Sequence, residues 1–206
     1  MFMKRCVALL LVMFLSLSAA AAEGWVAPME LNTDEENMLS MLGMSDDTHI
    51  YEYVAPEGAK TARLTLQELQ GWRWGVLSEV TLSMEDFGTE GRIVLVYREC
   101  LGVDLYASLW TENGYVSGQD HIEPDFDLWT MNISTDRLPE RTEIPAVGVS
   151  VPLMVQCLSD AAEMTDADLT LYGMPFVFAD CDRVYAVVVT FLDVTEAELY
   201  GWDESE

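Results

Sequence analysis

The chain has 206 residues, of which 36 are Asp or Glu and only 10 are Lys or Arg, so its formal net charge at pH 7 is −26. Such an acidic surface repels phosphate backbones and anionic membranes at long range, which argues against nucleic acid as a partner. The favoured meaning of the charge is solubility outside the cell. Recruitment of Ca²⁺ or of a cationic partner is the sharper alternative.

The first 22 residues have the layout of a secretory signal peptide. Two basic residues, Lys4 and Arg5, precede an almost wholly apolar run at residues 7–17, and small residues follow up to Ala22. The apolar run is too short to cross a membrane, and no later stretch reaches the roughly 20 apolar residues that a spanning helix needs. We therefore expect cleavage near Ala22 and a secreted or extracytoplasmic protein without an integral membrane segment.

The remainder of the chain is long enough for one sizeable core but hardly for two. It shows no internal repeat of fixed period, no low-complexity segment and no convincing linker between domains. We expect an N-terminal arm with a short helix over residues 23–48, followed by a single β-sandwich domain over residues 49–206. The start of the arm, residues 23–31, carries no periodic signal.

A short helix is predicted within the arm. Thr33 and Glu36 have the spacing of a capping box, and acidic residues in the first turn stabilise the positive end of the helix dipole. An apolar stripe follows at Met38, Leu39, Met41 and Leu42, before Gly43 ends the helix. We interpret the stripe as a face that packs on the sheet; a methionine-rich groove for a partner is the alternative.

From Thr48 onward, apolar residues alternate with polar ones, which is the pattern of β-strands. Short strands with a turn every ten residues or so are predicted over residues 50–54, 61–68, 72–76, 80–84, 93–97, 103–110 and 115–117. This meander favours an antiparallel sandwich or barrel. We predict an all-β fold, an antiparallel β-sandwich with a short N-terminal helix.

The most legible hairpin is centred on Gly71. If residues 69–71 form its loop, with Gly71 left-handed in a type I turn plus G1 bulge, Leu66 lies opposite Trp74. Trp72 and Trp74 then share one face with the leucines of the preceding strand. A loop of two residues would separate the tryptophans from the leucines, so we predict the first register and two core tryptophans.

The second half of the chain is less regular. Strands are predicted over residues 128–133, 147–157, 175–178 and 184–192, with a polar connection over 137–145 and a short acidic helix within 161–169. The last of these strands is apolar on both faces, so we expect it at the centre of a sheet.

Three cysteines follow the expected cleavage site: Cys100, Cys157 and Cys181. An odd number allows at most one intramolecular disulfide. None of the spacings is CxxC, and the chain has only two histidines, which disfavours a zinc site. We interpret the three thiols as small buried apolar side chains.

The sequence motifs of serine hydrolases, P-loop proteins and dinucleotide-binding proteins are absent. His49 and His121 have no neighbouring residues that suggest a catalytic triad, and we interpret both as ordinary surface residues. A small carbohydrate-active enzyme remains an alternative, because glycoside hydrolysis needs only two carboxylates at a suitable separation.

The densest acidic stretch spans residues 118–127 and contains Asp120, Glu123, Asp125 and Asp127. Hard oxygen ligands in a flexible loop suit Ca²⁺. The glycine and the distal glutamate of an EF-hand are missing, so a solvated acidic loop without a cofactor is the favoured interpretation. The alternative is a Ca²⁺-stabilised structural domain of the cell envelope.

Tyr106 and Trp110 are the candidate ligand-binding residues. Both lie on the face of their predicted strand that is opposite Leu105 and Leu109. Planar rings on an exposed sheet face stack sugars in many extracellular binding modules, and exposed apolar patches generally mark interaction sites. The favoured function is a non-catalytic binding or interaction module for an extracellular protein or a glycan. Coverage of the two rings by a neighbouring loop is the alternative.

Three stretches carry a resemblance: IYEYVAPEGAKTARLTLQELQGWRW at residues 50–74, GRIVLVY at 91–97 and VYAVVVTF at 184–191. Together they resemble uncharacterised exported β-rich proteins of Gram-positive bacteria. The resemblance implies a compact β-rich extracellular domain and brings no catalytic residues with it.

Overall fold

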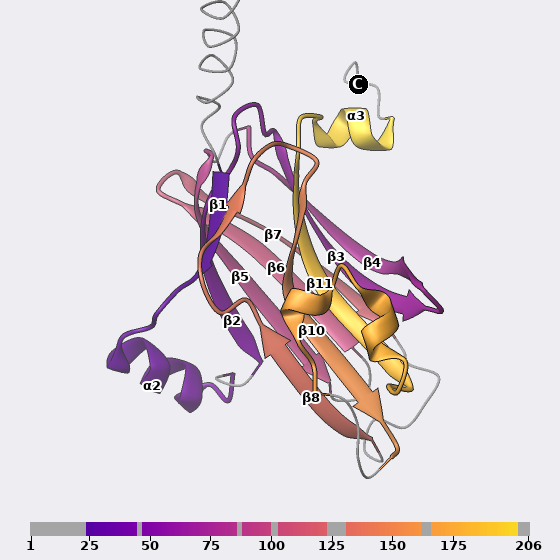
Figure 1. Ribbon diagram of the computed structural model, residues 1–206. Helices are drawn as coiled ribbons and strands as arrows, with labels where there is room; N and C mark the ends of the chain where they lie inside the picture. Colours follow the sequence, from indigo (N-terminus) through magenta and orange to yellow (C-terminus); the bar gives the residue numbers. More distant parts are fainter. Residues whose placement is uncertain are drawn as a thin grey trace, which may run out of the picture.

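The computed structural model describes residues 24–44, 47–85, 88–99, 103–122, 131–161 and 166–201. These residues form two antiparallel sheets, which confirms the predicted all-β sandwich with a short N-terminal helix (Figure 1). The expected signal peptide lies outside the described residues. In the described part of the chain, no helix is long and apolar enough to cross a membrane.

The two sheets contain six and five strands among the described residues. Sheet A runs from edge to edge through β7 (Gly114–Ile122), β6 (Val103–Thr111), β5 (Glu90–Glu99), β2 (Thr48–Val54), β1 (Gly24–Pro28) and β9 (Thr142–Ile144). Sheet B runs through β4 (Arg73–Ser83), β3 (Thr61–Gln70), β11 (Arg183–Leu192), β10 (Ser150–Ser159) and β8 (Asn132–Arg137). The central position predicted for the apolar strand β11 is confirmed.

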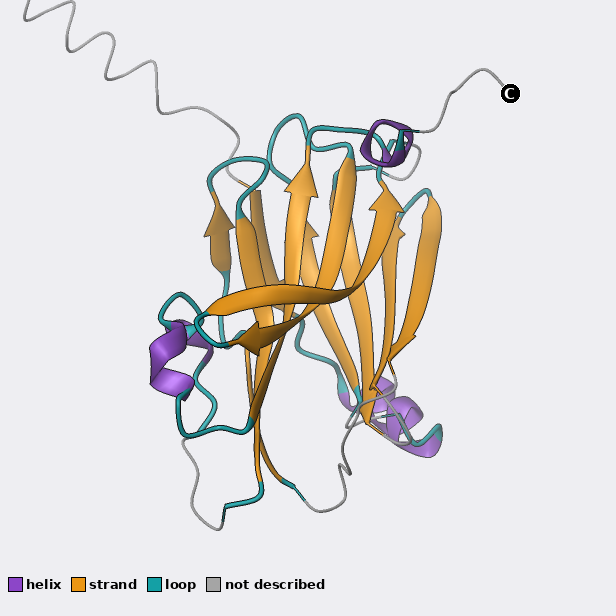
Figure 2. Cartoon of the chain, turned by 90° about the vertical axis from the view of Figure 1, so that its right-hand side faces the viewer, coloured by secondary structure: helices purple, strands orange, loops and turns teal. Residues whose placement is uncertain are grey.

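The helices lie outside the two strand layers (Figure 2). They are α2 (Thr33–Met41), the 3-10 helices η2 (Leu169–Leu171) and η3 (Pro175–Phe178), and α3 (Glu196–Tyr200).

The core lies between the inner faces of the two sheets. Alternate residues of the strands point into it, as the period of two requires; Leu95 and Leu105 of sheet A and Leu64 and Val187 of sheet B are completely buried. Full burial of such a side chain contributes about 1.5–3 kcal/mol, so the inner faces dominate the stability of the fold.

Hydrogen bonds also join the two sheets through the core. The Tyr51 hydroxyl donates to the Leu153 carbonyl at 3.1 Å, and the Tyr97 hydroxyl donates to Gln156 Oε1 at 3.0 Å. Because buried polar groups are costly when unpaired, these bonds specify how the sheets align.

The predicted register of the β3–β4 hairpin is wrong. The turn is Gly71–Trp72, with Gln70 opposite Arg73, and Leu66 lies opposite Ser78 instead of Trp74. Gly71 has φ +66° at the first central position, which suits a type II′ turn.

The apolar face is restored further along β4 by a bulge. Leu77 is the extra residue between the partners of Gln67 and Leu66, so the alternation shifts and Val80 and Leu82 enter the core. As a consequence, Trp72 at the turn is 64% exposed, and Trp74 is half-buried on the outer side of sheet B.

Helix α2 is present, but its expected contact with the sheet is wrong. None of its residues is buried, and the apolar stripe remains open, with Met38 64% and Met41 85% exposed. The capping residue is Asn32 instead of Thr33; its side chain accepts from two backbone N–H groups while Glu35 completes the capping box. The helix is therefore stabilised by its own cap and its acidic first turn.

Further expectations also differ from the structure. Residues 24–28 form strand β1 between β2 and β9, where no regular structure was expected, and β8 extends into the predicted polar connection. Residues 175–178 form η3 and not a strand, since Pro175 occupies the first helical turn. Of the predicted acidic helix at 161–169, the middle lies outside the described residues, and η2 begins only at Leu169.

The segment of residues 166–182, which we call the cap, covers the outer face of sheet B and contains η2 and η3 (Figure 1). Leu169 and Phe178 are buried against the core. The Tyr172 ring stacks on Trp74 with centroids 4.8 Å apart. Sheet B is thus buried on both faces around β10 and β11, which explains why these strands carry apolar residues on both faces.

Candidate functional site

The outer face of sheet A is the face directed away from the core. Its residues on β2, β5, β6 and β7 alternate with the buried ones and include Ile50, Glu52, Arg92, Val94, Val96, Tyr106, Ser108, Trp110, Tyr115 and Gln119. Several of these are apolar or aromatic and only half-buried. An apolar sheet face that retains contact with solvent is a candidate interaction surface.

The most exposed aromatic group on this face is the Trp110–Tyr115 pair. The two residues are direct cross-strand partners on β6 and β7, and their rings stack with centroids 4.7 Å and planes 15° apart. This separation matches the usual distance of about 4.7–4.9 Å between neighbouring strands, so the rings stand side by side over the sheet. One face of each ring is directed away from the pair.

Both rings are open to solvent, and the indole is held in place. Trp110 is 46% exposed and Tyr115 is 57% exposed. Trp110 Nε1 donates to Ser108 Oγ at 2.7 Å, and Ser108 itself is buried. Because the stack and this bond order the rings in advance, a ligand that stacks on them loses little side-chain entropy on binding.

Charged groups of both signs lie beside the pair. Arg92 on β5 is the cross-strand neighbour of Trp110, and Glu52 on β2 is the neighbour of Arg92. Both side chains are exposed. Trp110, Arg92 and Glu52 therefore lie side by side on neighbouring strands and offer an aromatic ring, a hydrogen-bond donor and a hydrogen-bond acceptor.

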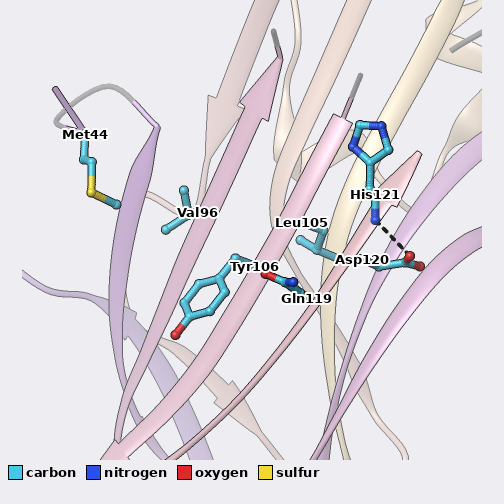
Figure 3. A pocket seen from close by; sticks show the side chains of 7 residues that line it. All are labelled: Met44, Val96, Leu105, Tyr106, Gln119, Asp120 and His121. Atoms are coloured by element: carbon cyan, nitrogen blue, oxygen red, sulfur yellow. Dashed lines mark hydrogen bonds between the residues drawn. The ribbon is translucent and has the colours of Figure 1, made fainter. Parts of the chain in front are cut away.

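A depression lies at the other end of strands β5, β6 and β7 and is lined by residues of both the outer and the inner side of sheet A. It has a volume of about 660 Å³ and is lined by Met44, Val96, Leu105, Tyr106, Gln119, Asp120 and His121. Figure 3 shows Met44, from the loop that follows α2, pointing toward Val96, with Tyr106 and Gln119 on the neighbouring strands β6 and β7.

The placement predicted for Tyr106 and Trp110 is confirmed: both lie on the outer face, opposite the buried Leu105 and Leu109. They do not form one site in contact, since they lie four residue steps apart on the strand, which corresponds to about 13 Å. Trp110 belongs to the stacked pair, whereas Tyr106 lines the depression. Their role in ligand binding stays a prediction.

Sequence reasoning missed Tyr115 and Arg92. The signal for Tyr115 was available, because the turn at residues 112–113 places Trp110 directly opposite it. Arg92 precedes the apolar run of β5 and was assigned to no site. Its position beside Trp110 follows only from the β5–β6 register.

The acidic stretch is only partly described. Asp120 lies within strand β7, not in a loop, and its carboxylate accepts from Ser78 Oγ at 2.6 Å and from the His121 N–H at 2.8 Å. Glu123, Asp125 and Asp127 lie outside the described residues. Among the described residues, no group of three or more His, Cys, Asp or Glu side chains is placed to hold a metal ion. The Ca²⁺ hypothesis stays a prediction.

The two histidines lie in different surroundings. His121 is exposed, as predicted. His49 is not a surface residue: it is half-buried on the inner side of sheet A, and burial, together with the charge of Arg137, lowers its pKa to about 4, against a smaller opposing effect of Asp47. His49 is therefore neutral at pH 7.

Comparison with known proteins finds no matching family, no matching curated protein and no matching solved structure.

Proposed function

We propose that this protein is an extracellular, non-catalytic module that binds a neutral glycan on the outer face of sheet A. The observation that carries the proposal is the stacked and exposed Trp110–Tyr115 pair.

The ring geometry suits a sugar. A pyranose presents a flat face of C–H groups, and an indole or phenol face stacks against it while removing apolar surface from water. The face of Trp110 that is directed away from Tyr115 lies toward β5, where Arg92 is the direct partner of Trp110 and the half-buried Val94 follows two residues further along the same outer face. A sugar ring on this side would contact the indole and the apolar surface of β5 together.

The neighbouring charges favour a neutral ligand. Arg92 and Glu52 supply a donor and an acceptor for sugar hydroxyls, and their charges balance. An anionic polymer would be repelled by the overall charge of −26. A glycan that extends along β6 would reach Tyr106 and the depression beside it.

Binding to a panel of soluble neutral and anionic polysaccharides, measured by affinity electrophoresis and then calorimetry, tests the proposal. We expect a neutral glycan to bind. Trp110→Ala and Tyr115→Ala should each weaken binding at least tenfold, which corresponds to about 1.4 kcal/mol. Tyr106→Ala should weaken it less, since Tyr106 lies at the far end of the face.

Trp72→Ala is the matched control, because Trp72 is also exposed but lies at the β3–β4 turn of sheet B. It should bind as the unchanged protein does. Loss of binding in Trp72→Ala with retention in Trp110→Ala would move the site to the hairpin. New reducing ends in the bound glycan would show the carbohydrate-active enzyme instead, and the absence of binding to every neutral glycan would refute the proposal.

A further inference from the structure

Two cysteines from distant parts of the chain meet where the cap joins sheet B. Cys157 lies on β10 and is completely buried, and Cys181 lies at the end of the cap and is half-buried. The two thiols share a hydrogen bond, in which the Cys157 S–H donates to Cys181 Sγ. The sequence allowed at most one disulfide among the three cysteines without indicating a pair, and the favoured interpretation was small buried side chains.

The backbone holds the two residues together independently of the thiols. The Asp182 N–H donates to the Leu158 carbonyl at 2.9 Å, and the Cys181 N–H donates to the Phe178 carbonyl at 3.1 Å. The Asp182 carboxylate also accepts from Ser159 Oγ at 2.9 Å. The residues that follow each cysteine are thus tied to one another, so the thiols meet through the fold of the main chain.

We propose that Cys157 and Cys181 form a disulfide that fastens the cap to sheet B when the protein meets an oxidising environment. A disulfide needs the two sulfur atoms at about 2 Å, and sulfurs that already share a hydrogen bond require only a small approach. Exported proteins are the class in which disulfides persist, which agrees with the expected signal peptide. The inference does not depend on glycan binding, which uses the other sheet.

The oxidant is a disulfide, either of a small thiol or of a thiol–disulfide oxidoreductase. The Cys181 thiolate attacks one sulfur of this disulfide and releases one thiolate; the Cys157 thiolate then attacks Cys181 Sγ in the mixed disulfide and releases the second. Both cysteine sulfurs are oxidised, the reagent disulfide is reduced to two thiols, and the two cysteine protons end on these thiols.

Cys181 is the thiol that starts the reaction, because it is the more accessible of the two. Burial raises the pKa of both thiols, and the hydrogen bond from Cys157 partly offsets this effect at Cys181. The thiolate is the reactive form. The rate of closure should therefore increase with pH through the neutral and mildly alkaline range.

The test is peptide mapping by mass spectrometry after the purified protein has equilibrated with oxidised glutathione. We expect a linked pair of peptides that contain Cys157 and Cys181, lighter by two hydrogens than the reduced pair, with Cys100 still open to alkylation. The link should persist in Cys100→Ser and be absent from Cys181→Ser. Alkylation of Cys157 or Cys181 in the oxidised protein, or a link from either one to Cys100, would overturn the proposal.

Thermal unfolding provides a second measurement. The disulfide closes a loop over residues 158–180, so the oxidised protein should melt roughly 5–10 °C above the reduced protein. Cys181→Ser should melt at one temperature under both conditions. An equal melting temperature for the oxidised and reduced forms of the unchanged protein would contradict a fastening role.

Discussion

The outer faces of the two sheets each carry a Trp–Tyr stack, and the two stacks have almost the same geometry. Trp110 and Tyr115 on sheet A have ring centroids 4.7 Å and planes 15° apart. Trp74 and Tyr172 on sheet B have centroids 4.8 Å and planes 19° apart. The first stack is open to solvent, whereas the second joins the cap to the sheet.

The difference comes from where the tyrosine lies in the chain. Tyr115 follows Trp110 after a tight turn, so the pair forms locally, and both rings remain exposed among the described residues. Tyr172 belongs to the cap and follows Trp74 by 98 residues. Phe178, also in the cap, makes an edge-to-face contact with the same indole, with ring centroids 6.4 Å apart. The same ring contact thus stays on an exposed surface in one place and closes a core in the other.

The largest difference in stability is expected between the variants that remove Trp74 and Trp110. Trp74→Ala removes the stack, the edge contact with Phe178 and the bond from Nε1 to the Tyr172 carbonyl at 3.1 Å. We expect it to lower the free energy of unfolding by about 2–4 kcal/mol. Trp110→Ala removes an exposed ring and should cost less than about 1 kcal/mol. Urea unfolding of both variants measures the difference; equal losses would show that the exposed stack also supports the fold.

The half-buried His49 and the exposed His121 should differ in how they affect the pH dependence of stability. His49, on the closed side of sheet A, has its pKa lowered to about 4 by burial and by Arg137, while an unfolded histidine has a pKa near 6.5. As the pH falls from 6.5 to 4, the unfolded chain therefore binds a proton that the folded chain does not. Between pH 6.5 and 4, the titration of His49 should therefore lower the free energy of unfolding by up to about 3 kcal/mol.

Urea unfolding at several pH values measures the loss. His49→Gln should remove most of the decrease between pH 6.5 and 4, because no titratable ring remains at this position. His121→Gln, on the open face, is the matched control and should keep the decrease. If both variants retain it, other groups cause the acid sensitivity.

The strands of the sandwich were predictable where one face is buried and the other is exposed to solvent, because apolar and polar residues alternate along such strands with a period of two. That is why β6 and its outward residues Tyr106 and Trp110 were placed correctly. Strand β1 was missed because a strand of five residues gives too few alternations to recognise. The hairpin register was missed because the bulge at Leu77 shifts the pattern within an otherwise regular strand.

The long-range parts were not predictable for another reason. The four residues of η3, Pro175–Phe178, are apolar enough to resemble a short buried strand, and apolar content alone does not distinguish such a strand from a 3-10 helix. The same holds for the meeting of Cys157 and Cys181, since spacing alone does not determine which thiols approach one another. At the candidate site, Arg92 needed the register between two strands that the sequence does not encode locally.

The smallest expected effects on stability come from removing the hydroxyl groups of Tyr172 and Tyr115. The Tyr172 hydroxyl donates to Gln67 Oε1 at 2.8 Å and is half-buried in the cap, so Tyr172→Phe should lower the free energy of unfolding by about 1 kcal/mol. Tyr115→Phe keeps the exposed stack and should change stability by less than about 0.5 kcal/mol. Chemical denaturation resolves both values. A larger loss in Tyr115→Phe than in Tyr172→Phe would mean that the tyrosine hydroxyl of the exposed stack contributes more to the fold than the one in the cap, contrary to this expectation.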